Sequence, residues 1–168
     1  MHDSPQDRQE RRALLTRKIT DQTGIDEAMI EQLVGAFYKR VRSDPLLAPI
    51  FAAKVSDWDA HNTKLCTFWS SVALMSGHYH GQPMQAHLNL PVDTSHFDRW
   101  LVLFEDTAVS LCPPAAAAHF MERARRIADS MELGIAAQRG EIKTPPRATA
   151  ACVRQPEMMQ NTNEPSTL

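Results

Sequence analysis

A chain of 168 residues is long enough for one domain with a substantial core and too short for two domains of ordinary size. Its 18 basic and 20 acidic residues give a net charge of −2, which argues against a protein that binds nucleic acid through a strongly basic surface. Three cysteines, none in a C-x-x-C motif, favour a reducing compartment. The N-terminus has no apolar segment typical of a secretory signal or membrane anchor, so we expect a cytoplasmic protein.

The two ends of the chain differ in composition from its middle. Residues 1–19 are polar with mixed charges, and residues 141–168 contain four prolines and few large apolar side chains. Segments of this kind bury too little apolar surface to hold a fixed conformation. We predict a flexible N-terminal tail at 1–19, a domain at 20–140 and a flexible C-terminal tail at 141–168.

Apolar residues recur at helical spacing in four segments of the middle region. Thr23 resembles the first residue of a capping box, with Asp26 three positions later, so we expect it to cap the first helix. No segment shows the alternation of a strand bounded by hairpin turns, and the predicted fold class is therefore all-α. The predicted helices start near Thr23, Ser56, Asp93 and Ala117, and they end at Asp44, Gly77, Pro113 and just before Gly140.

Two connectors join these helices. Residues 46–51 are short and apolar, whereas residues 77–92 are longer and include a piece at 83–88 that is expected to form one or two helical turns. Loops of that length inside a compact domain tend to be functional. The second connector also belongs to a stretch, residues 65–92, without any Asp, Glu, Lys or Arg. Its serines and histidines argue against burial in lipid, and an uncharged wall around a buried ligand explains it better.

Three side chains with hydrogen-bonding groups come from the inner faces of three different predicted helices. Tyr38 lies beside Phe37 in the first helix, His61 is in phase with the apolar stripe of the second, and Trp100 lies on the buried stripe of the third. Taken singly, each is most simply a core residue whose polar atom finds one partner. Together with His87 in the long connector, they indicate an apolar pocket with a few polar points. Such a pocket could host a haem through one neutral imidazole.

Three segments carry motifs of a known family. The first runs from Phe37 to Phe51, and the second begins at His61 and includes Leu65, Phe68 and Trp69. The third is GHYHGQPMQAHLNLP at 77–91, which contains the pattern G-x-Y-x-G-x-P followed by H-L-x-L-P. These segments resemble the truncated haemoglobins, and the third resembles their group III branch. Groups I and II carry glycine pairs at their loops, whereas this chain contains no Gly-Gly.

The resemblance, which covers roughly residues 20–135, implies a truncated globin fold, a two-over-two helical sandwich around haem b. By position, His87 is implied as the proximal ligand of the iron. Tyr38 and Trp100 are implied as the distal hydrogen-bonding pair, and His61 as the histidine of the distal helix. The implied contacts of the cofactor are His87, Phe51, Leu65, Phe68, Trp69 and Trp100.

Several functions stay open at this point. The first is a monomeric haem protein that binds O₂ and other diatomic ligands such as NO and CO, with bound O₂ stabilised by Tyr38 and Trp100. One charge-assisted hydrogen bond of about 1.5 to 3 kcal/mol would slow O₂ release by roughly 10- to 100-fold, which argues against simple oxygen transport. The alternative is a redox enzyme that oxidises nitric oxide or reacts with peroxide and needs a separate reductase. A cofactor-free helical interaction module is a further alternative, and none of the three involves nucleic acid or a membrane.

Overall fold

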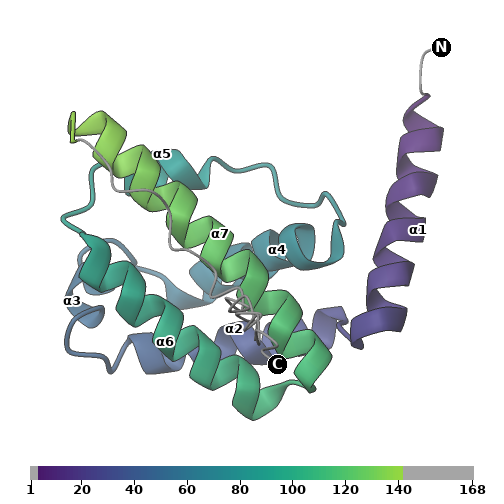
Figure 1. Ribbon diagram of the computed structural model, residues 1–168, viewed down its shortest axis with the longest axis horizontal. Helices are drawn as coiled ribbons and strands as arrows, with labels where there is room; N and C mark the ends of the chain where they lie inside the picture. Colours follow the sequence, from purple (N-terminus) through teal and green to yellow (C-terminus); the bar gives the residue numbers. More distant parts are fainter. Residues whose placement is uncertain (1–3, 142–168) are drawn as a thin grey trace, which may run out of the picture.

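The computed structural model describes residues 4–141, and every regular element in this range is a helix (Figure 1). This confirms the predicted all-α class. No helix of the described range is long and apolar enough to cross a membrane. Residues 142–168, where most of the C-terminal tail is predicted, lie outside the described residues. The helices are α1 (Pro5–Thr23), α2 (Glu27–Val41), α3 (Ala48–Ala52), α4 (Trp58–Leu74), α5 (Pro83–His87), α6 (Thr94–Leu111) and α7 (Pro114–Gln138).

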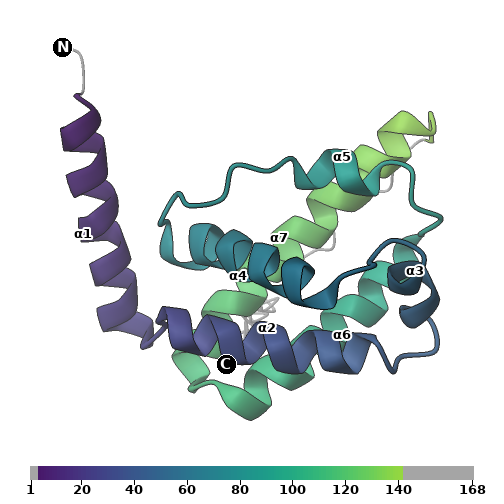
Figure 2. The same ribbon diagram turned by 180° about the vertical axis from the view of Figure 1, so that it is seen from behind.

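The four long helices that follow α1 in the chain, α2, α4, α6 and α7, form two layers. α2 packs against α4, and α6 packs against α7, while α2 also contacts α6 and α4 also contacts α7 (Figure 2). The short helix α5 lies against α7. The arrangement is the two-over-two sandwich that the family resemblance implies, and it buries the apolar faces of all four helices in one core.

A set of aromatic rings fills the centre of this core. The ring of Trp69 on α4 stacks on Phe104 of α6 at 4.8 Å, and Phe104 stacks on Trp100 at 5.4 Å. Phe37 of α2 meets Phe104 edge-on at 5.1 Å. Offset and edge-to-face contacts of this kind hold neighbouring helices in a defined orientation. Trp100 is therefore fixed on one side by the core.

The helix starts differ in one respect from the sequence prediction. The cap of α2 is Asp26, whose carboxylate accepts a hydrogen bond from the Met29 amide at 2.7 Å. The prediction that Thr23 fills this role is wrong because α1 extends to Thr23, whose hydroxyl donates to the Ile19 carbonyl. Gly24, with a φ of 76°, then ends α1 in the left-handed conformation that glycine adopts easily.

The two connectors contain short helices. Residues 46–51 were predicted as a connector, and α3 occupies part of it. The helical turns predicted at 83–88 are confirmed by α5. Helix α4 ends at Leu74, a few residues before the predicted end at Gly77, because Met75 adopts a left-handed conformation. The loop between α4 and α5 thus joins the two helices that carry His61 and His87.

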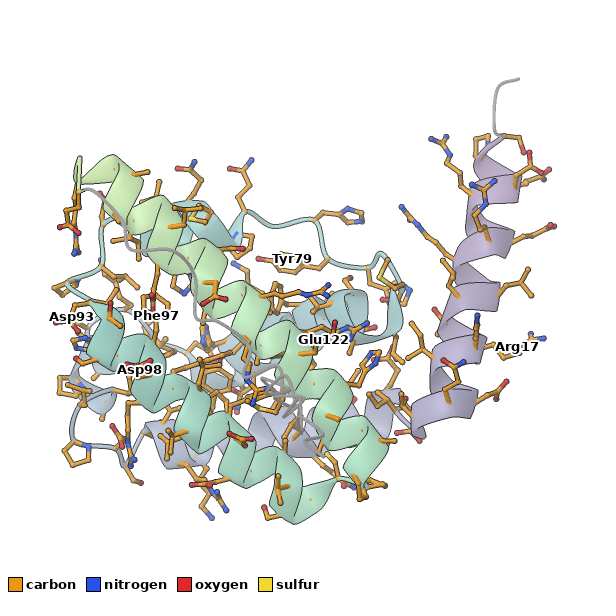
Figure 3. All side chains as sticks on the ribbon, in the orientation of Figure 1. Arg17, Tyr79, Asp93, Phe97, Asp98 and Glu122 are labelled. Carbon is orange, nitrogen blue, oxygen red and sulfur yellow. The ribbon has the colours of Figure 1, made fainter. Side chains whose placement is uncertain are left out.

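Most of the segment predicted as a flexible N-terminal tail forms α1, which stands at one edge of the molecule (Figures 1 and 2). Ser4 and Asp7 form a capping box, and Pro5 occupies the first turn, where its missing amide hydrogen costs nothing. Composition did not predict this helix because it has no buried apolar stripe. Its Arg17 points away from the rest of the molecule in Figure 3.

Side chains from two other helices satisfy the last carbonyl groups of α4. Thr16 of α1 donates to the Leu74 carbonyl at 2.7 Å, and Arg123 of α7 donates to the Val72 carbonyl at 3.0 Å. The Nε2 atom of His119 lies 2.8 Å from the Ala73 carbonyl. Carbonyls at a helix end have no partner within the helix, so these three donors anchor the end of α4 between α1 and α7.

Replacing Arg123 with methionine tests this anchor. The substitution keeps much of the apolar stem but removes the hydrogen bonds to the Val72 and His119 carbonyls. We expect the free energy of unfolding to fall by about 1 to 2 kcal/mol, measured by urea denaturation. Arg125→Met is the matched control, because Arg125 is exposed and meets Glu105 only at 3.4 Å, so its effect should be below about 0.5 kcal/mol. Equal effects of the two substitutions would contradict the anchor.

A buried carboxylate ties the turn after α2 to α6. The side chain of Asp44 is 3% exposed, and its Oδ2 accepts from Arg99 Nε at 2.6 Å. Its Oδ1 accepts from the amides of Leu46 and Leu47, both at 3.0 Å. Burial alone would raise the pKa of Asp44, but these hydrogen bonds and the charge of Arg99 together lower it below its ordinary value. The carboxylate thus joins the segment between Tyr38 and Phe51 to the residue preceding Trp100.

Asp44→Asn should lower the free energy of unfolding at pH 7 by about 1.5 to 3 kcal/mol, because the charge-assisted bonds are lost. A carboxyl group whose pKa is lowered on folding stabilises the protein above its unfolded pKa and loses this effect as the pH falls through the folded pKa. The difference between wild type and variant should therefore shrink below about pH 4. Urea denaturation at pH 7 and pH 3 measures this difference in the free energy of unfolding. Asp106→Asn is the control, because Asp106 is exposed. A difference that stays constant with pH would contradict the ionic role of Asp44.

Candidate functional site

Four rings from three helices meet at one end of the sandwich. We call Tyr38 of α2, Phe51 of α3, and Trp58 and His61 of α4 the distal cluster. His61 lies 5.7 Å from Tyr38, 6.3 Å from Phe51 and 5.6 Å from Trp58, measured between ring centroids. Tyr38 and Phe51 are 5.7 Å apart. The structure therefore brings together three residues that the sequence predicts for the site, Tyr38, Phe51 and His61.

Tyr38 is the buried member of this cluster, with 4% of its surface exposed. Burial raises the pKa of its hydroxyl above the ordinary value, and a hydrogen bond from the Trp100 side chain partly offsets that effect. The indole N–H of Trp100 can only donate, so the Tyr38 oxygen is the acceptor. The hydroxyl group of Tyr38 accordingly keeps its own proton and can donate it to another partner.

His61 presents an unsatisfied nitrogen in the interior. Its Nε2 atom is buried and has no hydrogen-bond partner among the described residues. Burial and the nearby charges of Lys64 and His87 lower the pKa of His61, so its imidazole is neutral at pH 7. A buried polar atom without a partner is costly, and it indicates a group that the protein binds.

His87 ends α5 on the other side of the α4–α5 loop. Its Nδ1 atom lies 2.6 Å from the Pro83 carbonyl. A carbonyl can only accept, so Nδ1 carries the proton and Nε2 keeps its lone pair when the ring is neutral. An imidazole held in this tautomer is suited to bind a metal through Nε2.

The predicted lining residues of α4 fall into two groups. Leu65 and Phe68 are half-buried, and Phe68 meets Tyr79 of the α4–α5 loop at 5.2 Å. Figure 3 shows Tyr79 projecting from this loop toward α4. Trp69 instead is 1% exposed and stacks in the core on Phe104, so it lies behind Phe68 and outside the distal cluster. Its predicted contact with a cofactor remains a prediction.

Two residues beside His61 were not predicted for the site. Trp58 lies three positions before His61 on the same helix face, and its ring also contacts Tyr38 at 6.4 Å and Phe51 at 6.1 Å. The Oδ1 atom of Asn62 is buried without a partner among the described residues. Extending the inner stripe of α4 by one turn toward its start would have found Trp58. No sequence signal singles out Asn62.

The family model described as "Bacterial-like globin" matches residues 18–132 of this chain. The chain belongs to the bacterial-like globin family. The globin is 41% identical over 88 residues to the group 3 truncated hemoglobin ctb of Campylobacter jejuni, a match that covers 49% of this chain and 69% of that protein. It is 33% identical over 84 residues to the group 2 truncated hemoglobin YjbI of Bacillus subtilis, covering 49% and 64% of the two chains.

A solved structure shares the fold of this globin. It is the crystal structure of the group III truncated hemoglobin from Campylobacter jejuni, with a TM-score of 0.62 and 34% sequence identity. The superposition covers 66% of this chain and 91% of that chain. The group III resemblance inferred from the His87 motif is thereby confirmed, and membership of the globin family supports haem-based binding of small ligands.

The residues of the site fit a haem. His87 on α5 offers a lone pair at Nε2, and the orphaned Nε2 of His61 comes from a different helix, α4. Residues 65–92, which contain Phe68 and His87, carry no charged Asp, Glu, Lys or Arg side chain. Uncharged and aromatic walls with a few polar atoms are what a porphyrin requires. The family match begins at residue 18, so most of α1 lies outside it.

Proposed function

We propose that this globin holds haem b through His87 and binds O₂ and other diatomic ligands, including NO and CO, beside Tyr38. The observation that carries the proposal is that two histidines, His61 and His87, each have an Nε2 atom available to a bound group. The Nδ1 proton of His87 is occupied by the Pro83 carbonyl, and the Nε2 atom of His61 is buried without a described partner. Haem, when bound, supplies a ferrous iron that takes a diatomic ligand.

On the proximal side, α5 sets the orientation of His87. The Pro83 carbonyl four residues earlier holds the ring through Nδ1 at 2.6 Å. This bond fixes the tautomer and raises the basicity of Nε2, as outer-shell partners of ligating histidines do. Pro83 begins α5, where its fixed φ favours the helical turn.

On the distal side, Tyr38 is the residue best placed to donate to the ligand. Trp100 donates to its oxygen, and this hydrogen bond polarises the hydroxyl so that its proton becomes a better donor. Neutral His61 has one nitrogen that can donate and one that can accept. Because Tyr38 is buried, its bond to a ligand that carries partial negative charge is not weakened by water.

The absorption spectrum of the purified full-length chain after addition of haem tests the proposal. We expect a strong Soret band that shifts when the protein is reduced and exposed to CO. A protein with native helix content but without such a band would overturn the haem proposal and favour the helical interaction module. Gel filtration of the same sample tests the expected monomer.

The Tyr38–Trp100 pair also favours a second candidate, the oxidation of nitric oxide. Slow O₂ release leaves time for NO to arrive, and one NO, one O₂ and one electron together give nitrate. The electron must come from a separate reductase, which we propose as a partner in a reducing cytoplasmic compartment. Consumption of NO by the oxygenated protein with equimolar nitrate would support this activity, and NO binding without nitrate would exclude it. Reaction with peroxide is tested by the same protein with a reducing dye.

A further inference from the structure

Trp58 closes the side of the distal cluster where α2 ends and α4 begins. It is the first residue of α4, it is half-buried, and its ring contacts those of Tyr38, Phe51 and His61. Its ring stacks on Phe51 with an interplanar angle of 26°, whereas it meets His61 edge-on. The half-buried ring of Trp58 therefore packs on the buried ring of Tyr38 from the more exposed side of the cluster.

An arginine from the neighbouring helix lies over the same ring. The Cζ atom of Arg42 is 4.9 Å from the centroid of the Trp58 ring, a distance typical of a cation–π interaction. Arg42 follows Tyr38 by one helical turn at the end of α2 and is exposed. Within residues 4–141 it takes part in no salt bridge, so the contact with Trp58 is not a by-product of an ion pair. The contact between Arg42 and Trp58 thus connects the end of α2 with the start of α4.

We propose that Arg42 and Trp58 form a gate through which small ligands reach the distal cluster. The inference rests on the proposed function, since it concerns the route to Tyr38. A ligand that passes between the end of α2 and the start of α4 has to displace the Trp58 ring. The guanidinium of Arg42 stabilises the position in which the ring blocks this route.

The strength of the interaction sets the size of the expected effect. Loss of a cation–π contact at an exposed site should raise the fraction of molecules with an open gate by about two- to fivefold. A gate does not change the contacts that the bound ligand makes. A gate that opens more often therefore raises the rates of ligand binding and ligand release by the same factor. The equilibrium affinity then stays unchanged. A residue that only orients His61 would instead change the affinity.

The experiment measures CO binding after flash photolysis, and CO release by ligand replacement, on the haem-loaded full chain. For Arg42→Gln we expect both rates to rise by about two- to fivefold with the same affinity. Trp58→Ala should raise both rates further, and adding Arg42→Gln to Trp58→Ala should have no additional effect. Arg42→Lys keeps a cation and should lie near wild type. Arg40→Gln is the matched control, because Arg40 is exposed on the same helix and it is Arg42 that makes the cation–π contact with Trp58.

A second measurement does not depend on ligand kinetics. In a proton–nitrogen correlation spectrum of the full chain, the Trp58 indole signal is assigned by its loss in Trp58→Phe. Arg42→Gln should shift this signal, since a positive charge leaves the face of the ring, while the signals of Trp69 and Trp100 stay in place. Arg40→Gln should shift none of the three.

Each outcome has a definite consequence. Rates for Arg42→Gln equal to those for Arg40→Gln, or a change in release without a matching change in binding, would overturn the gate. An unshifted Trp58 signal would do so as well. Absence of a Soret band in the wild-type protein would overturn the proposed function and the gate together, whereas a normal band with unaltered variant kinetics removes the gate alone.

Discussion

Replacing His87 with glycine should abolish stable haem binding and the strong Soret band. Loss of even an outer-shell partner of a metal ligand lowers metal affinity by 10- to 100-fold. Removal of the ligand itself should therefore lower haem affinity by more than about 100-fold. Titration of the protein with haem, followed at the Soret wavelength, measures the loss. His78→Gly is the matched control, because His78 is exposed in the same uncharged loop and should leave the affinity unchanged.

The His87→Gly variant also permits a test that separates ligation from folding. Glycine leaves space where the imidazole ring was, so free imidazole at high concentration should restore part of the Soret band. Far-ultraviolet circular dichroism should show helix content close to that of wild type, since His87 is the last residue of the five-residue helix α5. Normal haem affinity in His87→Gly would mean that another residue is the ligand.

The helices that carry the site could be predicted because their inner faces repeat at helical spacing. Ile30, Leu33, Val34, Phe37 and Val41 are all buried on α2, as their spacing indicates. His61 could be recognised by its phase with the stripe of α4, and His87 by the motif around it. Periodicity reports which face of a helix is buried, and this is enough to place polar residues that share that face.

Contacts between residues far apart in sequence could not be predicted in this way. Asp44 and Arg99 form their ion pair across 55 positions, and the carbonyls at the end of α4 are reached from α1 and α7. The resemblance supplied the pairing of Tyr38 with Trp100, but not the direction of the hydrogen bond between them. Nor does spacing distinguish Trp69, which lies in the core, from Phe68, which adjoins it on α4. These features depend on how the layers pack.

Replacing Tyr38 with phenylalanine should accelerate O₂ release by roughly 10- to 100-fold, because a buried charge-assisted hydrogen bond is lost. CO carries less charge on its outer atom, so its release should change less. Stopped-flow measurement of O₂ release and CO replacement gives both rates. Tyr79→Phe is the matched control, since Tyr79, the other tyrosine of the chain, packs its ring on Phe68 in the α4–α5 loop. Equal changes for the two gases would contradict the hydrogen bond to the ligand.

Trp100→Phe then distinguishes a relay from two independent donors. If Trp100 acts by polarising the Tyr38 hydroxyl, its loss removes one neutral hydrogen bond and should accelerate O₂ release by about two- to tenfold. In the Tyr38→Phe background the same substitution should then have little further effect, because the hydroxyl that it polarises is absent. If the accelerations of O₂ release caused by the two single substitutions multiply in the double variant, Trp100 donates to the ligand directly. The Trp100 side chain lowers the pKa of the Tyr38 hydroxyl by hydrogen bonding, which favours the relay, since a single indole N–H serves one acceptor at a time.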